Sequence, residues 1–238
     1  MEVLAKPTDA QIKNLRCVII PTDFKNCPKQ FAFYYAEAYR LWKSIWAHTF
    51  KTESKIEEPE MLFSDNYLLQ DEVICLFSEN KAIGVVSLAL LDLNCTAHRE
   101  LSYFSDYPAE ILEKLTIETP NILAVSALAI DKNWCRRTVG FRVSEVLVGY
   151  TVKRFLETSA EIFVAITRNY RRVNEMIYHY GGQPLCEGIL SHGVGADISA
   201  IYRDKAVFNR CATPVQTLMN DLWNERIIIG SSALSDIH

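Results

Sequence analysis

The chain carries the run Asn121-Ile-Leu-Ala-Val-Ser-Ala-Leu-Ala-Ile130, an almost unbroken apolar segment of strand length. An apolar run without polar alternation predicts a strand that is covered on both faces of its sheet. A polar, basic turn follows at residues 131–138, and Gly140 precedes a helix that the three-and-four spacing of apolar residues predicts over 141–158. The segment therefore predicts a buried strand that leads through a tight turn into a helix.

A second strand and a second helix come next. Residues 160–166 are again apolar, and a helix is expected over 171–180. Gly181 and Gly182 end this helix, where glycine adopts a left-handed cap at low cost. A buried strand that runs into a helix N-terminus leaves backbone N–H groups free to bind an anion. The turn after Ile130 is therefore the main indication of function.

Composition limits the class of protein. The chain has 238 residues, a hydrophobic content of 49% and a charged content of 23%, which are typical of a globular protein with a sizeable core. A net charge of −4 gives no overall basic field, so we expect no nucleic-acid partner. The seven cysteines form no CxxC pair, which favours a reduced, cytoplasmic protein. We expect no secretory leader, no membrane span and no metal site.

The remaining elements predict one sheet with helices on both faces. Strands are expected near residues 17–20, 72–78, 82–91, 185–190 and 198–202, and further helices over 30–50, 109–115 and 214–224. This order predicts an α/β (α+β) fold with a mixed sheet. We expect a single domain over residues 1–210 and a helical C-terminal extension over 211–238.

Two motifs resemble the GCN5-related N-acetyltransferase (GNAT) superfamily over about residues 122–190. Leu128-Ala-Ile-Asp-Lys-Asn-Trp-Cys-Arg-Arg-Thr-Val-Gly140 is similar to its central strand, pyrophosphate loop and helix start. Arg171 through Gly182, with Tyr178 four residues before the last glycine, is similar to its closing helix.

The loop departs from the family pattern Gln/Arg-x-x-Gly-x-Gly/Ala. In an ungapped register Cys135, Thr138 and Gly140 take the three positions, so only the last one fits. In a register shifted by two, Arg137 and Gly140 fit, but Arg142 takes the small-residue place. We prefer the ungapped register, which keeps the apolar face of the following helix buried. Side chains at glycine positions restrict the approach of a pyrophosphate.

The resemblance implies a mostly antiparallel central sheet flanked by helices on both faces, and an N-acyltransferase activity. The acyl donor would be acetyl-CoA, another acyl-CoA or an acyl-acyl carrier protein, and the acceptor a small amine such as an amino acid. The aromatic helix near Trp42, the run 65–67 and the glycine-bearing C-terminal hairpin look like the acyl-homoserine-lactone synthase and N-acyl amino acid synthase branch, which uses acyl carrier protein. Residues 124–129 offer only Ser126 as a polar side chain, so lactone formation itself is not expected. The oligomeric state stays open.

The resemblance also implies roles for particular residues. Tyr178 is the candidate acid for the leaving thiolate, with a core tyrosine as the alternative. A backbone N–H near residues 129–131 would bind the carbonyl oxygen. Glu118 is the candidate base, with Glu100, His98 or a water chain in its place; the alternative for each of the three side chains is a surface residue without a catalytic role. The expected cofactor-binding residues are Leu128, Ala129, Ile130, Cys135, Arg136, Arg137, Thr138, Val139, Gly140, Phe141, Arg171 and Asn174.

Three further questions remain open at this level. The aromatic stripe of the helix over 30–50 is either core packing or one wall of an acyl pocket; it consists of Tyr35, Tyr39, Trp42, Trp46 and Phe50. A basic cluster is either a solvated face or a docking site for acidic acyl carrier protein; it consists of Lys153, Arg154, Arg168, Arg171 and Arg172. The alternative to an enzyme is a binding or sensor module that has kept the fold but lost the loop.

Overall fold

A computed structural model describes residues 12, 14–23, 25, 27–53, 65–134, 141–208 and 213–230. Its strands are β1 (Leu15–Pro21), β2 (Glu72–Ser78), β3 (Lys81–Asp92), β4 (Asn121–Ile130), β5 (Ile162–Arg168), β6 (Gln183–Ser191), β7 (Val194–Tyr202) and β8 (Ile227–Ile228). Its α-helices are α2 (Ala32–Thr52), α3 (Asp65–Leu68), α4 (Thr96–Arg99), α5 (Ala109–Glu118), α7 (Val143–Leu156), α8 (Val173–His179) and α9 (Thr213–Asn224).

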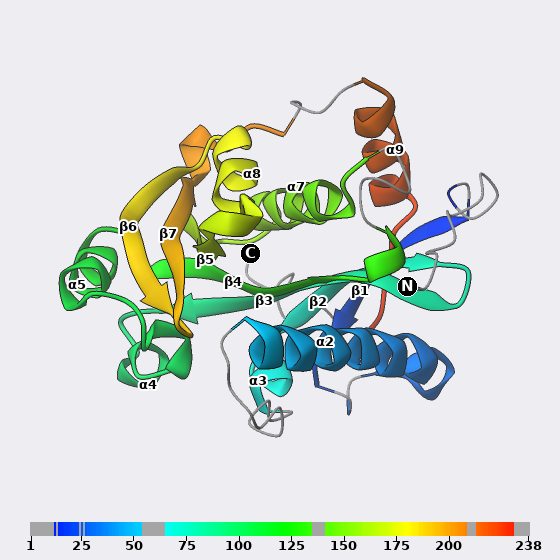
Figure 1. Cartoon of the computed structure of the whole chain (residues 1–238), viewed down its shortest axis with the longest axis horizontal. Helices are drawn as coiled ribbons and strands as arrows, with labels where there is room; N and C mark the ends of the chain where they lie inside the picture. Colours follow the sequence, from blue (N-terminus) through cyan, green and yellow to red (C-terminus); the bar gives the residue numbers. More distant parts are fainter. Residues whose placement is uncertain are drawn as a thin grey trace.

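The described strands form one sheet in the order β6-β7-β5-β4-β3-β2-β1-β8. Neighbouring strands are antiparallel except for the pairs β4–β5 and β1–β8, which are parallel. Helices α2 and α3 cover one face, and α7, α8 and α9 cover the other (Figure 1). The predicted mixed, mostly antiparallel sheet with helices on both faces is therefore confirmed.

Helix α7 is the centre of one face of the core. The apolar residues Val146, Leu147 and Tyr150 are buried against the sheet, as their spacing predicts. Helix α8 ends before Gly181, whose φ of 91° lies in the left-handed region. A Cβ at Gly181 would collide with the carbonyl oxygen of Lys205, so this position requires glycine both for its conformation and for space.

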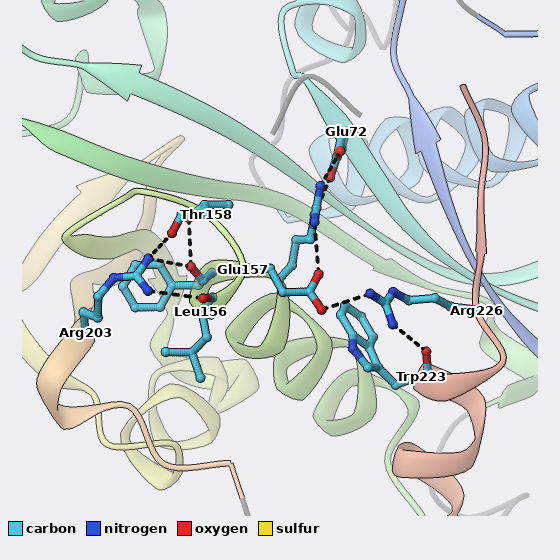
Figure 2. A network of polar contacts seen from close by, with 9 residues as sticks. Glu72, Leu156, Glu157, Thr158, Arg203, Trp223 and Arg226 are labelled. Carbon is cyan, nitrogen blue, oxygen red and sulfur yellow. Dashed lines mark hydrogen bonds and ion pairs between the residues drawn. The ribbon is translucent and has the colours of Figure 1, made fainter. Parts of the chain in front are cut away.

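Ion pairs and hydrogen bonds fix the C-terminal end of α7 (Figure 2). Arg154 donates to both carboxylate oxygens of Glu72 on β2 at 2.9 Å, and the two side chains are only 3% and 1% exposed. Arg203 donates to the carbonyl oxygens of Phe155 and Leu156 at 3.0 and 3.2 Å, which satisfies acceptors that a helix end leaves open. The helix is therefore held to the sheet by polar contacts as well as by its apolar face.

The C-terminal residues belong to the same packed unit. Met219, Leu222 and Trp223 of α9 join the core cluster of α7, and β8 adds a strand next to β1. Arg226 donates to Glu157 at 2.9 Å, which links this segment to the end of α7. The predicted helix is present, but the segment also contributes to the sheet. The boundary predicted between residues 210 and 211 lies outside the described residues.

Candidate active site

The sheet opens between its two central strands. β4 and β5 pair in parallel only from Ile122 with Ile162 to Val125 with Ala165, although both strands continue beyond this point. The pairing of β4 with β3 is irregular at the same place, since Ser87 faces Ser126 while Val85 faces Ala129. Two residues of β4 therefore lie opposite one residue of β3, which is a β-bulge that bends the strand. We call the resulting opening the fork.

Ala127 lies in the bulge with a φ of 54°, which is uncommon for a residue with a side chain. The left-handed conformation costs an L-residue about 1–2 kcal/mol. Strain of this kind persists only where the surrounding structure imposes it, and it is common at binding and active sites. The surrounding structure therefore holds the backbone in this conformation at the fork.

Two cavities adjoin the fork. The α7-side cavity has a volume of about 360 Å³, and its walls include Leu128, Ile130, Val148, Phe163, Met176 and Ile177. The α2-side cavity has a volume of about 380 Å³, and its walls include Trp42, Trp46, Phe50, Leu91, Tyr103 and Ile166. Both are lined by Trp46, Val125, Ser126, Ala127, Ile166 and Arg168, so the two cavities meet at the fork.

Backbone N–H groups line one edge of the fork. The N–H of Asp131 donates to the carbonyl of Ile83 in β3 at 2.9 Å, so within the stretch 129–131, where an oxygen donor is expected, Asp131 already has a partner. Because successive strand residues direct their N–H groups to opposite sides, those of Leu128 and Ile130 are directed to the β5 side, away from β3. Among the described strands none pairs with β4 beyond Val125 on this side, so these groups lie at an unpaired strand edge.

A polar cluster closes one end of the fork. Glu53, at the end of α2, accepts from Arg168 of β5 at 2.5 Å and also from Tyr170 and Arg171. Burial alone would raise the pKa of Glu53, but its bonds to Tyr170 and Arg171 and the nearby charges outweigh this effect, and the pKa lies below its ordinary value. The cluster joins elements more than a hundred residues apart.

Tyr178 belongs to a second polar cluster, on α8 and β7. Its hydroxyl donates to Asp197 at 3.4 Å, and Asn174 donates to the same oxygen at 3.0 Å. Burial is the first cause of the raised pKa of Tyr178. Burial would also raise the pKa of Asp197, which is only 4% exposed, but bonds from Gly188, Asn169, Asn174 and Tyr178 lower it below its ordinary value. Tyr178 is not among the described residues that line the two cavities.

The predicted site residues separate into groups. Leu128, Ile130 and Arg171 line the α7-side cavity, whereas Ala129 is buried on the α2 face. Phe141 packs against the core on the α7 face, and Asn174 contacts Asp197. The predicted loop residues Cys135, Arg136, Arg137, Thr138, Val139 and Gly140 lie outside the described residues.

The structure does not bring Glu118 to the fork. Its side chain is 55% exposed at the end of α5, where it pairs with Lys114 at 4.0 Å. The described lining of neither cavity includes it. Ionisable side chains that do line the cavities are Glu53, Arg168, Arg171, Asp106 and His192. The sequence contains one indication of Glu53: it follows Phe50 by three residues and so continues the helical spacing of Trp46 and Phe50.

The structure bears on two of the questions that the sequence left open, the role of the aromatic stripe and that of the basic cluster. The aromatic stripe serves both purposes: Tyr35, Tyr39 and Trp42 pack on Tyr67, and Trp42 lines the α2-side cavity together with Trp46 and Phe50. The prediction of one basic surface is wrong. Arg154 is buried on Glu72, Arg168 pairs with Glu53, and Lys153 lies 4.2 Å from the centre of the Phe208 ring.

Two further features bear on the class of site. Within the described ranges, no three His, Cys, Asp or Glu side chains come together as metal ligands. None of the helices in the described part of the chain combines the length and apolar character that a bilayer crossing requires.

Known structures share this fold. An N-acyl amino acid synthase from uncultured soil microbes, FeeM, matches with a TM-score of 0.54 and 16% identity over 80% of this chain and 94% of its own. The acyl-homoserine-lactone synthase LasI matches with a TM-score of 0.54 and 15% identity over 79% and 90%. A CoA-dependent acyl-homoserine lactone synthase, BjaI, matches with a TM-score of 0.55 and 11% identity over 90% and 92%, in a structure with SAM and isopentyl-CoA. Neither a protein-family model nor a curated protein sequence matches this chain.

The fold is therefore GNAT-like, and its structural neighbours are acyltransferases of the synthase branch that the sequence resembles. At these identities the likeness establishes the fold, and the chemistry has to be argued from the fork itself.

Proposed function

We propose that this protein is a cytoplasmic acyltransferase that moves an acyl group from a pantetheine thioester, of coenzyme A or of acyl carrier protein, to the amine of a small acceptor such as an amino acid. The fork between β4 and β5 carries this proposal, because it combines free backbone donors with an apolar cavity on either side. A slender pantetheine arm suits an opening between two strands, and the apolar α2-side cavity suits an acyl chain.

The proposed reaction assigns a role to each part of the fork. The thioester oxygen accepts hydrogen bonds from the N–H groups of Leu128 and Ile130, which stabilise the charge that develops on it. The amine nitrogen bonds to the carbonyl carbon, and its surplus proton passes to water. The carbon–sulfur bond breaks, and the thiolate takes the hydroxyl proton of Tyr178, which solvent then replaces. The Tyr178 hydroxyl is protonated at neutral pH even at the ordinary tyrosine pKa, and burial raises its pKa further.

Binding and turnover together test the proposal. We expect heat of binding with acetyl-CoA, with longer acyl-CoAs or with acyl-loaded carrier protein in isothermal titration calorimetry. We also expect release of free thiol that depends on an added amine. A folded protein that gives no heat with any of these thioesters would contradict the proposal.

A second candidate is a binding or sensor module with the same fold. Two observations favour it: the loop carries Cys135 and Thr138 where the family has Gln/Arg and glycine, and Tyr178 lies outside the cavity lining. This candidate predicts thioester binding without amine-dependent thiol release for any acceptor, whereas the acyltransferase predicts both.

A further inference from the structure

Two buried N–H donors at the fork have no partner in the described structure. The Arg168 side chain is 12% exposed, and its Nη1 bonds to Glu53, but its Nη2 is buried without a hydrogen bond. The Nε1 of Trp46 is also buried without a hydrogen bond. An unpaired buried donor costs roughly 1–3 kcal/mol, and more when it is charged. Two such donors in neighbouring side chains indicate a place that a ligand acceptor completes.

The two side chains are in contact and share the same surroundings. The guanidinium carbon of Arg168 lies 5.1 Å from the centre of the Trp46 indole ring, which is a cation–π contact. Each residue lines both the α7-side and the α2-side cavity. The unpaired donors therefore belong to the wall where the two cavities meet, next to the backbone donors of β4.

The acceptors nearby are already engaged. The Glu53 carboxylate accepts from Arg168, Tyr170 and Arg171, and Asp106 accepts from Ser191 at 2.8 Å. Both carboxylates thus already accept hydrogen bonds, whereas Arg168 Nη2 and Trp46 Nε1 are donors without a partner in the described structure. A guanidinium N–H bonds a carboxylate more strongly than a neutral acceptor, and Nη2 is the group that the bond of Nη1 to Glu53 leaves open.

From this arrangement we infer that Arg168, with the Trp46 indole, binds the carboxylate of the acceptor, so that the acceptor is an amino acid and not a simple amine. The inference rests on the proposed function and narrows its substrate class. Arg168 acts as a specificity-determining residue: it holds the anionic end of the acceptor while the amine reaches the thioester at the fork.

The inference can be tested on the unaltered protein with pairs of acceptors that differ only in whether the carboxyl group is charged. L-Leucine and the other L-amino acids are compared with their carboxamides, such as L-leucinamide, at a fixed thioester concentration. We expect at least one amino acid to be used with a kcat/KM roughly tenfold or more above that of its amide, the usual scale for a charged hydrogen bond. Equal use of acids and amides, or transfer to uncharged amines only, would overturn the inference and leave the acyltransferase proposal standing. Absence of thioester binding would instead contradict the acyltransferase proposal.

Variants of Arg168 then test whether this residue causes the preference for an amino acid over its amide. Arg168→Gln is expected to raise the KM for the amino acid about tenfold and to bring the acid-to-amide ratio close to one, while Arg168→Lys keeps part of the preference. The matched control is Arg172→Gln, because Arg172 is 62% exposed, pairs with Glu175 and is not in the described cavity lining. A change in the KM for the thioester alone would show that Arg168 binds the donor, which would overturn the inference. An unchanged acid-to-amide ratio in folded Arg168→Gln would do so as well.

Discussion

The hydroxyl of Tyr103 donates to the carbonyl of Val164 at 2.9 Å, next to the last residue at which β5 pairs with β4. Tyr103 lies in the turn Ser102–Phe104, and its ring forms part of the α2-side cavity. A second, longer contact of 3.4 Å reaches the carbonyl of Val125 on β4. One side chain thus touches both strands at the base of the fork.

Removal of this hydroxyl is expected to loosen the base of the fork. Tyr103→Phe keeps the ring but loses the bond to Val164, which should lower the free energy of unfolding by about 1 kcal/mol. Urea denaturation measures the change. The control is Tyr107→Phe, because within the described part of the chain the Tyr107 hydroxyl makes a single long contact, of 3.5 Å to the Tyr103 hydroxyl. Equal losses of unfolding free energy in both variants would show that the bond to Val164 stabilises the protein no more than the contact between Tyr107 and Tyr103 does.

Tyr178, on α8, and Tyr180, directly after the end of α8, offer a matched pair of tyrosines. As the proposed acid, Tyr178→Phe should lower kcat by at least about tenfold with little change in the KM for the thioester. Tyr180 is fully buried and donates to the carbonyl of Glu145 at 3.1 Å, so Tyr180→Phe should lower stability and leave kcat near its original value. Steady-state thiol release measures both. An unchanged kcat in Tyr178→Phe would remove this residue from the reaction.

Glu53 should make stability depend on pH. Its folded-state pKa is lowered, so its charge stabilises the fold above the unfolded-state pKa of about 4.3 and the contribution declines as pH falls through the lowered pKa. Glu53→Gln is therefore expected to cost most between pH 5 and 7 and progressively less below about pH 4. Urea denaturation at several pH values measures the difference. A cost that stays constant down to pH 3 would contradict this origin.

The ion pair between Arg154 and Glu72 should be far more sensitive than a surface pair. Glu72→Gln removes the fully buried carboxylate from Arg154 and leaves only the Glu157 carboxylate at 3.0 Å, so the loss should exceed that of a surface pair but stay below the roughly 3–5 kcal/mol of a buried charge with no partner. Glu175→Gln breaks the exposed pair with Arg172 and should cost no more than about 1 kcal/mol. Chemical denaturation compares the two variants. Similar small losses would mean that the pair is readily replaced by other contacts.

The strained backbone of Ala127 gives a test of the bulge. Ala127→Gly relieves the left-handed conformation and should change stability by less than about 1 kcal/mol, while Ala127→Val should cost roughly 2 kcal/mol or more. Ala124→Gly, on the same strand but at ordinary φ, is expected to lose stability. Thermal and urea unfolding rank the three variants. A loss from Ala127→Gly as large as that from Ala124→Gly would contradict strain at the bulge.

The sequence predicted the fold because its main signals are local. The apolar runs at 121–130 and 160–166 and the spacing of α7 depend only on neighbouring residues, and the structure has β4, β5 and α7 in these places. The aromatic stripe was also visible, but its division between Tyr67 and a cavity depends on what α2 faces.

The contacts among the polar side chains at the fork could not be found in this way, although Arg171 was itself expected in the site. Glu53 meets Arg168 across more than a hundred residues of chain, and no local pattern encodes such a contact. Arg154 was assigned to a basic surface because its helical position did not reveal Glu72 behind it. Glu118 lies shortly before β4 in the sequence, but its side chain is 55% exposed at the end of α5, a placement that distance along the chain does not determine.

The fork has one consequence for how such proteins diverge. The groups that it offers to a carbonyl oxygen are peptide amides, which every residue except proline provides, so side-chain drift along β4 leaves them intact. A site of this kind can persist through extensive side-chain substitution, provided that the two strands separate at the same point. Substitutions in the cavity walls can then change substrate specificity while these amides stay in place.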